Sequence, residues 1–496
     1  MRSAIRLGHS ICACFLLPVL AGCGSGAQKA ERVAVIGDPA SAFETGLRLT
    51  PPAQMLRTAT SEGLVTFDPE GKVIPGLADR WIVTDDGLTY IFRLRDARWP
   101  DGNAITGESA RTALRQALDG LRGTPLALDL ASVQEVQAMA GRVIEVRLGQ
   151  PMPDLLQLLA QPELGLFHHA KGWGPMALKR DGAMAVLTPI APEKRGLPAD
   201  DPEATGLRSV HLVAEPGERA FADFGKGDAD VVLGGSFLDL PRTGRTALGK
   251  TTARVDPVIG LFGLLVTRSD GQADGLLATP SGREAVAMVI DRESLAAGLA
   301  SAGWAPSTRI VAAGLEGDPG LVGERWTDID LDGRRTLATR RIAQWQAASH
   351  QKPVLLVALP QGPGADILFD RLASDMQEVG ITLQRARPGA PADLKLVDTI
   401  ARYGRPAWFL NQFNCAVLHG PCSAEADALA DKARTAPAGP TAAALWAQAE
   451  QVLTASNVFI PLGPPIRWSL VPAGAGGFLV NRWGAHPLAA LAQARH

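Results

Sequence analysis

The sequence predicts an α/β fold on two observations. Short apolar segments of strand length alternate along the chain with longer segments whose apolar residues recur at helical spacing. The 53 glycines and 36 prolines are dispersed among these segments, as expected for turns, and no low-complexity linker or internal repeat interrupts the alternation. A chain of 496 residues is too long for a single core, so two or three domains are expected.

The individual elements follow from this alternation. Each predicted strand is an apolar or alternating run, and the first of them ends at the turn signal Gly37-Asp38-Pro39. Thr106 is the expected N-cap of a helix over 108–121, whose alanine and leucine side chains share one face. The predicted strands are 32–36, 89–94, 231–233, 354–359 and 458–460, and further helices are expected over 281–299 and 441–453.

Residues 1–22 have the pattern of a bacterial lipoprotein signal peptide. Arg2 and Arg6 precede an apolar stretch from Ile11 to Leu20, which is far shorter than the roughly 20 residues that a spanning helix needs. The stretch ends in Leu20-Ala21-Gly22-Cys23, so cleavage before Cys23 would free its amine and thiol for acylation. An ordinary secretory peptide with an incidental cysteine is the alternative. We expect a periplasmic body attached to an envelope membrane through lipid alone.

Charge and cysteine usage agree with that compartment. Without the leader, 47 Lys and Arg face 51 Asp and Glu, a net charge of about −4 that gives no support for nucleic-acid binding. Cys415 and Cys422 are then the remaining cysteines, and a disulfide between them would contribute roughly 2.5 kcal/mol by the chain-entropy estimate. A metal site formed by Cys415, His419 and Cys422 is the rival interpretation, but a fourth ligand is absent nearby.

The segment from Glu62 to Gly102 carries the strongest signal. It reads EGLVTFDPEGKVIPGLADRWIVTDDGLTYIFRLRDARWPDG and contains the turn signals Asp68-Pro69-Glu70-Gly71 and Asp85-Asp86-Gly87. This run resembles the early segment of the extracellular solute-binding proteins of family 5, the oligopeptide-, dipeptide- and nickel-binding type of ABC transporter. Further stretches that match in the family's order are 223–232, 282–295, 366–383 and 444–462.

The resemblance implies a two-lobed periplasmic-binding-protein fold of type II with an extra domain. Lobe one would comprise 33–60, 185–260 and 460–496, the extra domain 61–184, and lobe two 261–459. A peptide or other small molecule would be enclosed between the lobes, because contacts with both exist only in the closed state. The implied partners are an ABC permease and its ATPase; the implied state is a monomer, and no cofactor is expected.

The family's ligand anchor is altered in this chain. Peptide-binding members carry an aspartate that pairs with the ligand's α-amine, in a segment similar to 399–411 here. Aligning Tyr403, Pro406 and the Phe409-Leu410 pair puts Arg402 at the aspartate position. An arginine there would favour a carboxylate, phosphate or sulfate. Alternatively, Arg402 points into solvent or pairs with an acid such as Asp398, and binds nothing.

Other candidate ligand-binding residues rest on weaker arguments. Glu62 and Gly63 lie where family members approach the ligand, although a turn-stabilising role is equally reasonable. Asp38 ends the first strand, a favoured position for cleft residues, or it caps a turn. Tyr403 comes from the alignment, and Trp408 could stack on a ligand, although a core role is favoured for it. With 2 tyrosines in the chain and Gly463-Pro464-Pro465 on the return strand, we expect a cleft poor in aromatic groups.

The sequence does not predict an enzyme. Nucleophile-elbow, P-loop, dinucleotide and HExxH motifs are all absent. His168-His169 is the histidine pair of the chain, and adjacent side chains point apart on a helix or a strand, so no metal site is expected there. Two alternatives remain open. One is a degenerate binding fold that acts as an envelope scaffold or sensor, and the other is an envelope hydrolase with a dispersed triad.

Overall fold

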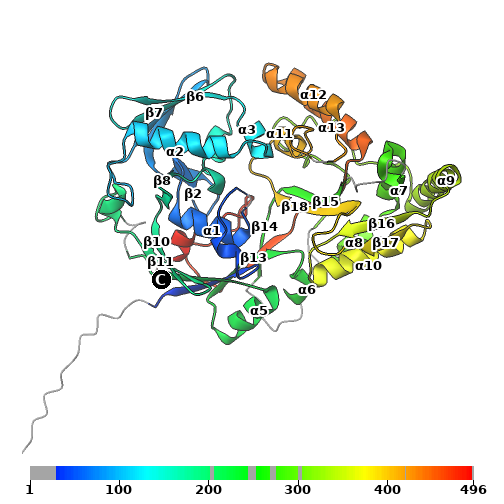
Figure 1. Ribbon diagram of the computed structural model, residues 1–496, viewed down its shortest axis with the longest axis horizontal. Coiled ribbons are helices and arrows are strands. Elements are labelled where there is room, and N and C mark those ends of the chain that lie inside the picture. The colour runs from blue at the N-terminus through cyan, green and yellow to red at the C-terminus, as the bar shows by residue number, and fades with distance from the viewer. Residues whose placement is uncertain are drawn as a thin grey trace, which may run out of the picture.

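The computed structural model describes residues 29–47, 49–201, 206–243, 253–267, 275–299, 304–418 and 420–493. It has three main sheets with helices packed around them (Figure 1), which confirms the predicted α/β class. The predicted signal peptide, Cys23 and His419 lie outside the described residues. No helix of the described part is long and apolar enough to cross a membrane.

A seven-stranded sheet contains both early and late segments of the chain. Its strand order is β10-β11-β12-β1-β13-β20-β14, and β1 is parallel to both of its neighbours. Successive residues of β1 face opposite layers: Val33 and Val35 pack with α1 and α14, and Ala34 packs with α5. The strands are β1 (Glu31–Ile36), β10 (Met176–Asp181), β11 (Met184–Pro189), β12 (Val210–Glu215), β13 (Val231–Ser236), β14 (Ala253–Asp256) and β20 (Arg467–Leu470), and the helices are α1 (Pro51–Thr60), α5 (Gly217–Lys226), α6 (Leu240–Thr243) and α14 (Leu488–Leu491).

A five-stranded sheet forms the second region of the fold. Its order is β17-β16-β18-β15-β19, and its core contains Phe262, whose ring lies 5.0 Å from that of Phe237. The strands are β15 (Gly260–Val266), β16 (Val354–Ala358), β17 (Thr382–Arg385), β18 (Leu394–Ile400) and β19 (Phe459–Gly463). The helices of this region are α7 (Pro280–Val289), α8 (Arg292–Leu299), α9 (Leu331–Ser349), α10 (Pro363–Gln377), α11 (Pro406–Asn411), α12 (Ala424–Thr435) and α13 (Pro440–Ser456).

A four-stranded antiparallel sheet of order β4-β5-β7-β6 forms the third region. The predicted cap of its long helix is present, because Thr106 Oγ1 accepts from Ser109 N at 3.1 Å and Ser109 Oγ accepts from Thr106 N at 3.0 Å. The elements are β2 (Val65–Phe67), β3 (Val73–Pro75), β4 (Ala78–Val83), β5 (Thr89–Leu94), β6 (Val133–Met139), β7 (Val143–Leu148), β8 (Phe167–His168), β9 (Lys171–Gly172), α2 (Gly107–Gly120), α3 (Pro125–Asp129) and α4 (Leu155–Leu159). Short 3-10 turns are η1 (Ser41–Phe43), η2 (Pro162–Leu164), η3 (Pro192–Arg195) and η4 (Leu276–Ala278).

The chain passes between the seven-stranded and five-stranded sheets at two places. One crossing, 257–259, joins β14 to β15, and the other, 464–466, joins β19 to β20. The division into two lobes and an extra domain stays a proposal, and strand pairing would move some of its boundaries. β10 pairs within the seven-stranded sheet and would join lobe one, whereas β19 pairs with β15 and would belong wholly to lobe two.

Candidate functional site

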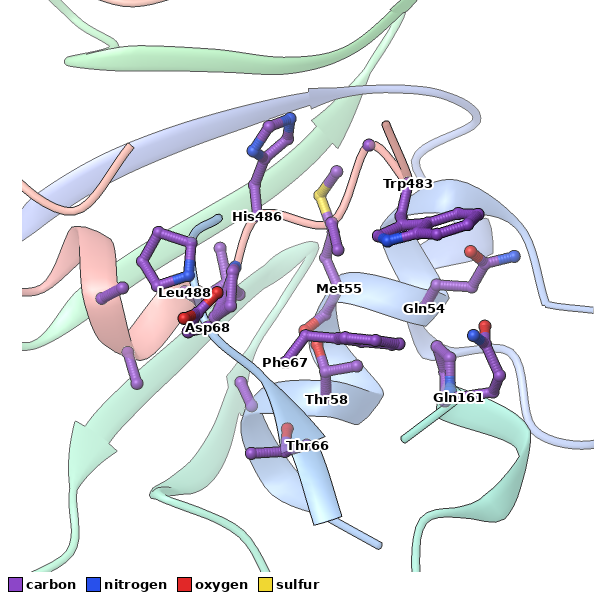
Figure 2. Close-up of a pocket in the computed structure, with 18 of the residues that line it drawn as sticks. Gln54, Met55, Thr58, Thr66, Phe67, Asp68, Gln161, Trp483, His486 and Leu488 are labelled. Carbon is purple, nitrogen blue, oxygen red and sulfur yellow. The ribbon is translucent and has the colours of Figure 1, made fainter. Parts of the chain in front are cut away.

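A cavity of about 900 Å³ lies where the three regions meet. Its walls come from α1, the β2–β3 hairpin, the end of β18, strand β20 and the C-terminal segment 483–493. Figure 2 shows Gln54, Met55 and Thr58 of α1 among these lining side chains. The volume is in the range of sites that enclose small molecules.

Aromatic and apolar groups make up much of the cavity wall. Trp468 on β20 and Trp483 in the C-terminal segment both line it, together with Phe67 and Met55. The expectation of an aromatic-poor cleft considered tyrosines and the return strand, and neither lines the cavity. The aromatic rings of the wall belong to β2, β20 and the segment that follows it.

Several charged side chains of the wall are paired within the protein. Arg195 Nη2 lies 3.1 Å from Glu62 Oε2, and Arg467 Nη1 lies 2.8 Å from Asp398 Oδ1. His486 Nε2 lies 3.1 Å from an oxygen of Asp256. Burial raises the pKa values of Glu62 and Asp398, and the partner arginines act in the opposite direction by stabilising each carboxylate. In these two arginine–carboxylate pairs of the cavity wall, the opposite charges offset each other.

Arg402 lines the cavity, but its guanidinium group contacts Glu163. Its backbone carbonyl also accepts a hydrogen bond from Gln161 Nε2 at 3.3 Å. The acid that pairs with Arg402 is therefore not Asp398, which is held by Arg467. Sequence reasoning could not find Glu163, because it lies 239 positions earlier in the chain.

Tyr403 and Trp408 lie outside the cavity wall. The Tyr403 hydroxyl donates to Asp129 Oδ1 at 2.8 Å, and burial raises the pKa of this tyrosine well above its usual value, so the phenol keeps its proton. Trp408 is 2% exposed and packs edge-on against Phe409, with ring centroids 4.9 Å apart. This core position corresponds to the role favoured for Trp408 over ligand stacking.

These contacts belong to a larger polar interface between the four-stranded region and the segment after β18. We call it the domain-bridging cluster. It also contains the Arg405–Asp154 ion pair, and Asn411 Nδ2 donates to Asp129 Oδ1 at 2.7 Å. An apolar core that spans both regions accompanies it. The members of the domain-bridging cluster are Asp129, Asp154, Glu163, Arg402, Tyr403, Arg405 and Asn411.

The remaining candidate residues have different roles. Glu62 lines the cavity, whereas Gly63 does not: a Cβ there would lie 2.5 Å from Leu159 O, so this glycine permits close backbone packing. Asp38 is exposed and accepts from Ala40 N at 2.8 Å, which is the turn-capping alternative.

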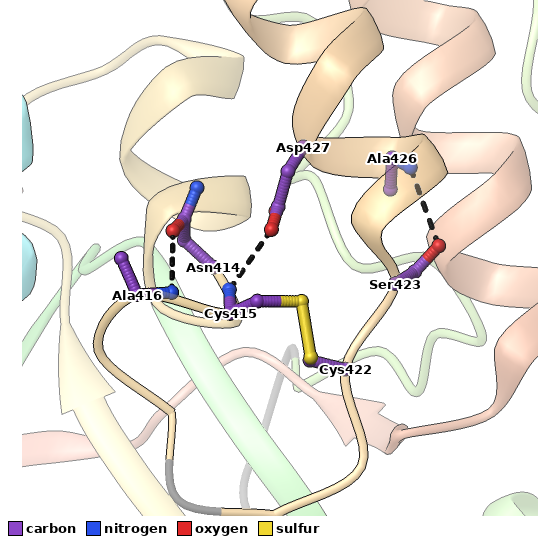
Figure 3. Close-up of a disulfide and its surroundings, with 7 residues drawn as sticks. All are labelled: Asn414, Cys415, Ala416, Cys422, Ser423, Ala426 and Asp427. Carbon is purple, nitrogen blue, oxygen red and sulfur yellow. Dashed lines mark hydrogen bonds between the residues drawn. A yellow bond between two sulfur atoms is a disulfide. The ribbon is translucent and has the colours of Figure 1, made fainter.

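Cys415 and Cys422 form a disulfide (Figure 3). The backbone N–H of Cys415 also donates to Asp427 Oδ2 at 2.9 Å, which fixes the loop to α12. Cysteines joined in this way cannot serve as thiolate metal ligands. The structure therefore contradicts the alternative in which both sulfurs bind a metal with His419.

His168 and His169 do not point apart, in contrast to the expectation for adjacent residues. Their ring centroids are 4.1 Å apart, and both rings approach Asp101. The cause is the backbone, because His169 and Ala170 have φ angles of 48° and 62° and so belong to neither a regular strand nor a helix. The expectation that the two side chains point apart was wrong for this reason.

Comparison with solved structures identifies the fold. Solved structures cover almost the whole chain at low sequence identity. The structure of Haemophilus influenzae OppA in complex with RPPGFSPFR has a TM-score of 0.79 at 18% identity. The alignment covers 94% of this chain and 99% of that chain. The *Escherichia coli* murein tripeptide binding protein MppA also has a TM-score of 0.79, at 18% identity with 93% and 97% covered. Its unliganded open form has a TM-score of 0.59. The architecture is that of a periplasmic binding protein.

Sequence comparison finds a family match over part of the chain. Residues 72–196 match the model of the bacterial extracellular solute-binding proteins, family 5 Middle. The probable deoxycholate-binding periplasmic protein YgiS of *Escherichia coli* is 36% identical over 158 residues, which are 27% of this chain and 30% of that protein. The aligned part thus spans less than a third of this relative's length. The family match thus covers part of the chain, and the family and structural neighbours are binding proteins.

Proposed function

We propose that this protein is the ligand-capturing component of an ABC importer, which holds a small solute between its lobes and delivers it to a membrane permease. The observation that carries the proposal is the cavity of about 900 Å³, whose walls come from both large sheets and from the β2–β3 hairpin. Such a site gains its full set of contacts only when the lobes are closed. The printed names of OppA and MppA, a peptide complex and a tripeptide binder, support this class of function.

The paired charges favour a solute with little net charge. An anionic ligand would have to compete with Glu62, Glu163 or Asp398 for three arginines that are already paired. Arg95 also lines the cavity, and its Nε donates to the carbonyl of Gly76. Trp483, which is partly exposed at the cavity, instead offers apolar surface and stacking. A zwitterionic peptide or an amphipathic molecule fits this wall better than an inorganic anion does. Arg402 then serves to hold the lobes together and not to capture an anion.

Two finer features belong to the same proposal. The protein acts in the periplasm as a monomer, and Cys23 carries the lipid that holds it on the membrane. Supporting observations are the Leu20-Ala21-Gly22-Cys23 motif and the periplasmic location stated in the names of relatives. The permease and ATPase are expected partners because the relatives include putative ABC transporter peptide-binding proteins.

Native mass spectrometry of the protein, purified gently from cell envelopes, tests the capture function. We expect a noncovalent small mass that is lost on partial unfolding, and a thermal stabilisation when the same compound is returned to the stripped protein. Intrinsic fluorescence should respond as well, because two tryptophans line the cavity. A ligand-free protein that no peptide, bile-acid or metal-complex panel stabilises would contradict capture. That outcome would favour the envelope scaffold or sensor.

Arg402→Ala should weaken capture of every ligand by a similar factor, because it removes a contact between the regions and not a contact with the ligand. We expect a five- to twentyfold loss, which corresponds to about 1–2 kcal/mol for a part-buried ion pair. Titration calorimetry with a neutral and an anionic ligand measures it. Glu163→Gln is the matched control and should give a similar loss. A loss confined to anionic ligands, with Glu163→Gln unaffected, would show that Arg402 binds the anion.

A further inference from the structure

We propose that Asp101, His168 and His169 form a binding site for a divalent transition-metal ion, with Zn²⁺ as the ion that best suits the donors. The proposal does not rest on the importer function, because none of the three residues lines the cavity. Their ligand atoms all lie within 4.8 Å of one another. Two imidazoles and one carboxylate are a donor set that zinc uses at sites with an open coordination position.

The two imidazoles already converge on one carboxylate oxygen of Asp101. Nδ1 of His168 lies 2.7 Å from Asp101 Oδ2, and Nδ1 of His169 lies 2.8 Å from the same oxygen. A tetrahedral zinc ion with bonds of about 2.0–2.2 Å would hold its donors roughly 3.3–3.5 Å apart. An outward movement of each ring by less than about 1 Å would therefore admit the ion.

The surroundings fix two of the three side chains. Asp101 Oδ1 accepts from the backbone N–H of Asn103 at 3.0 Å, which leaves Oδ2 for the histidines. The His168 ring stacks on Trp99 at 5.1 Å with an interplanar angle of 12°. Trp99 is 1% exposed, and its Nε1 donates to Ser109 Oγ at 3.0 Å. Outer contacts of this kind orient metal ligands and limit the entropy lost on binding.

The turn between β8 and β9 explains how adjacent histidines share one site. His169 and Ala170 both have positive φ, which is the signature of a type I′ hairpin turn that usually takes Asn-Gly. Side chains in this region of φ carry a local energetic cost. The turn brings the His169 ring next to that of His168, while its side chain stays 73% exposed. An ion can therefore enter from solvent, and water can complete its coordination.

The positive φ at His169 permits a well-matched experiment. Asparagine tolerates this backbone region, so His169→Asn removes the imidazole without adding strain. His350 also has a positive φ, of 57°, at the end of α9, and His350→Asn is the matched control. The protein is purified without a polyhistidine tag, stripped with chelator and titrated calorimetrically with Zn²⁺.

We expect one equivalent of Zn²⁺ to bind the wild type and the His350→Asn variant with equal affinity, and to raise the melting temperature of both. His169→Asn and Asp101→Asn should each weaken binding by about tenfold or more. His168→Gln provides a second imidazole deletion if either variant folds poorly, as judged by circular dichroism. Equal zinc affinity in wild type and His169→Asn, or an equal loss in His350→Asn, would overturn the proposal, because the ion would then bind adventitiously elsewhere.

Discussion

Replacing Arg309 by methionine should lower the free energy of unfolding by about 3–5 kcal/mol. The Arg309 guanidinium lies 3.1 Å from Asp318 and 2.8 Å from Glu450, and these three side chains are 7%, 4% and 2% exposed, respectively. The carboxylate of Glu450 also accepts from the backbone N–H of Val311 at 3.1 Å. Removing the arginine leaves two buried carboxylates without their counter-charge, and methionine fills the space without repairing that loss.

Urea denaturation monitored by tryptophan fluorescence measures this effect. The matched control is Arg122→Met, because Arg122 pairs with Asp119 while their side chains are 80% and 60% exposed. The control should change stability by less than about 1 kcal/mol. If Arg309→Met costs no more than the control, the buried network contributes no more than a surface pair, and the explanation by uncompensated charge is wrong.

The second large effect concerns Asp129 and pH. Burial raises the pKa of Asp129 to about 7, despite the opposing hydrogen bonds from Asn411 and Tyr403. Oδ1 accepts both of those bonds, whereas Oδ2 is buried and has no hydrogen-bond partner among the residues that the structure describes, which suits the protonated acid. The folded protein therefore holds a proton here that the unfolded chain releases once the pH exceeds the ordinary value of 3.8.

The sign of the pH dependence follows from proton uptake. Between about pH 4 and pH 7 the folded state binds more protons at this site, so the free energy of unfolding falls as the pH rises. A pKa raised from 3.8 to about 7 corresponds to a total loss of roughly 4 kcal/mol across this window. Because Asp129 joins Tyr403 and Asn411 across the domain-bridging cluster, we also expect ligand-free closure to be favoured in acid.

Asp129→Asn removes the titration and keeps the shape of the side chain. Unfolding measured from pH 4 to pH 8 should show a smaller decline in the variant than in the wild type, with the largest difference at the alkaline end. Asp119→Asn is the control for the Asp-to-Asn change, because its carboxylate is exposed at the surface. Parallel profiles for wild type and Asp129→Asn would show that the buried acid does not titrate in this window.

Local patterns predicted the fold class and several elements. The Thr106 cap was predictable because a capping residue and its helix are neighbours in sequence, and the turn signals between Glu62 and Gly102 act over a few residues. The disulfide loop follows the same logic, since Cys415 and Cys422 are 7 residues apart. In each case the physical cause of the structure lies within a short stretch of chain.

The site could be predicted only in part because its contacts join distant segments. Glu62 lines the cavity, but the partner of Arg402 is Glu163 in another region of the fold. Trp483 reaches the cavity from a segment without regular structure, and no periodic pattern marks it. The histidine pair shows a further limit, since one unexpected φ angle reverses the direction of a side chain.

In the proposed capture function, the two crossings between the large sheets would limit the entropy that is lost on closure. One crossing contains Pro257, and the other contains Pro464 and Pro465. Each crossing joins a strand of the seven-stranded sheet to a strand of the five-stranded sheet, and both of these strands are hydrogen-bonded within their own sheet. Proline fixes φ, so few backbone torsions remain free where the lobes can rotate. The open protein therefore has little conformational freedom to lose when it closes. More of the interaction free energy with the solute can then appear as affinity.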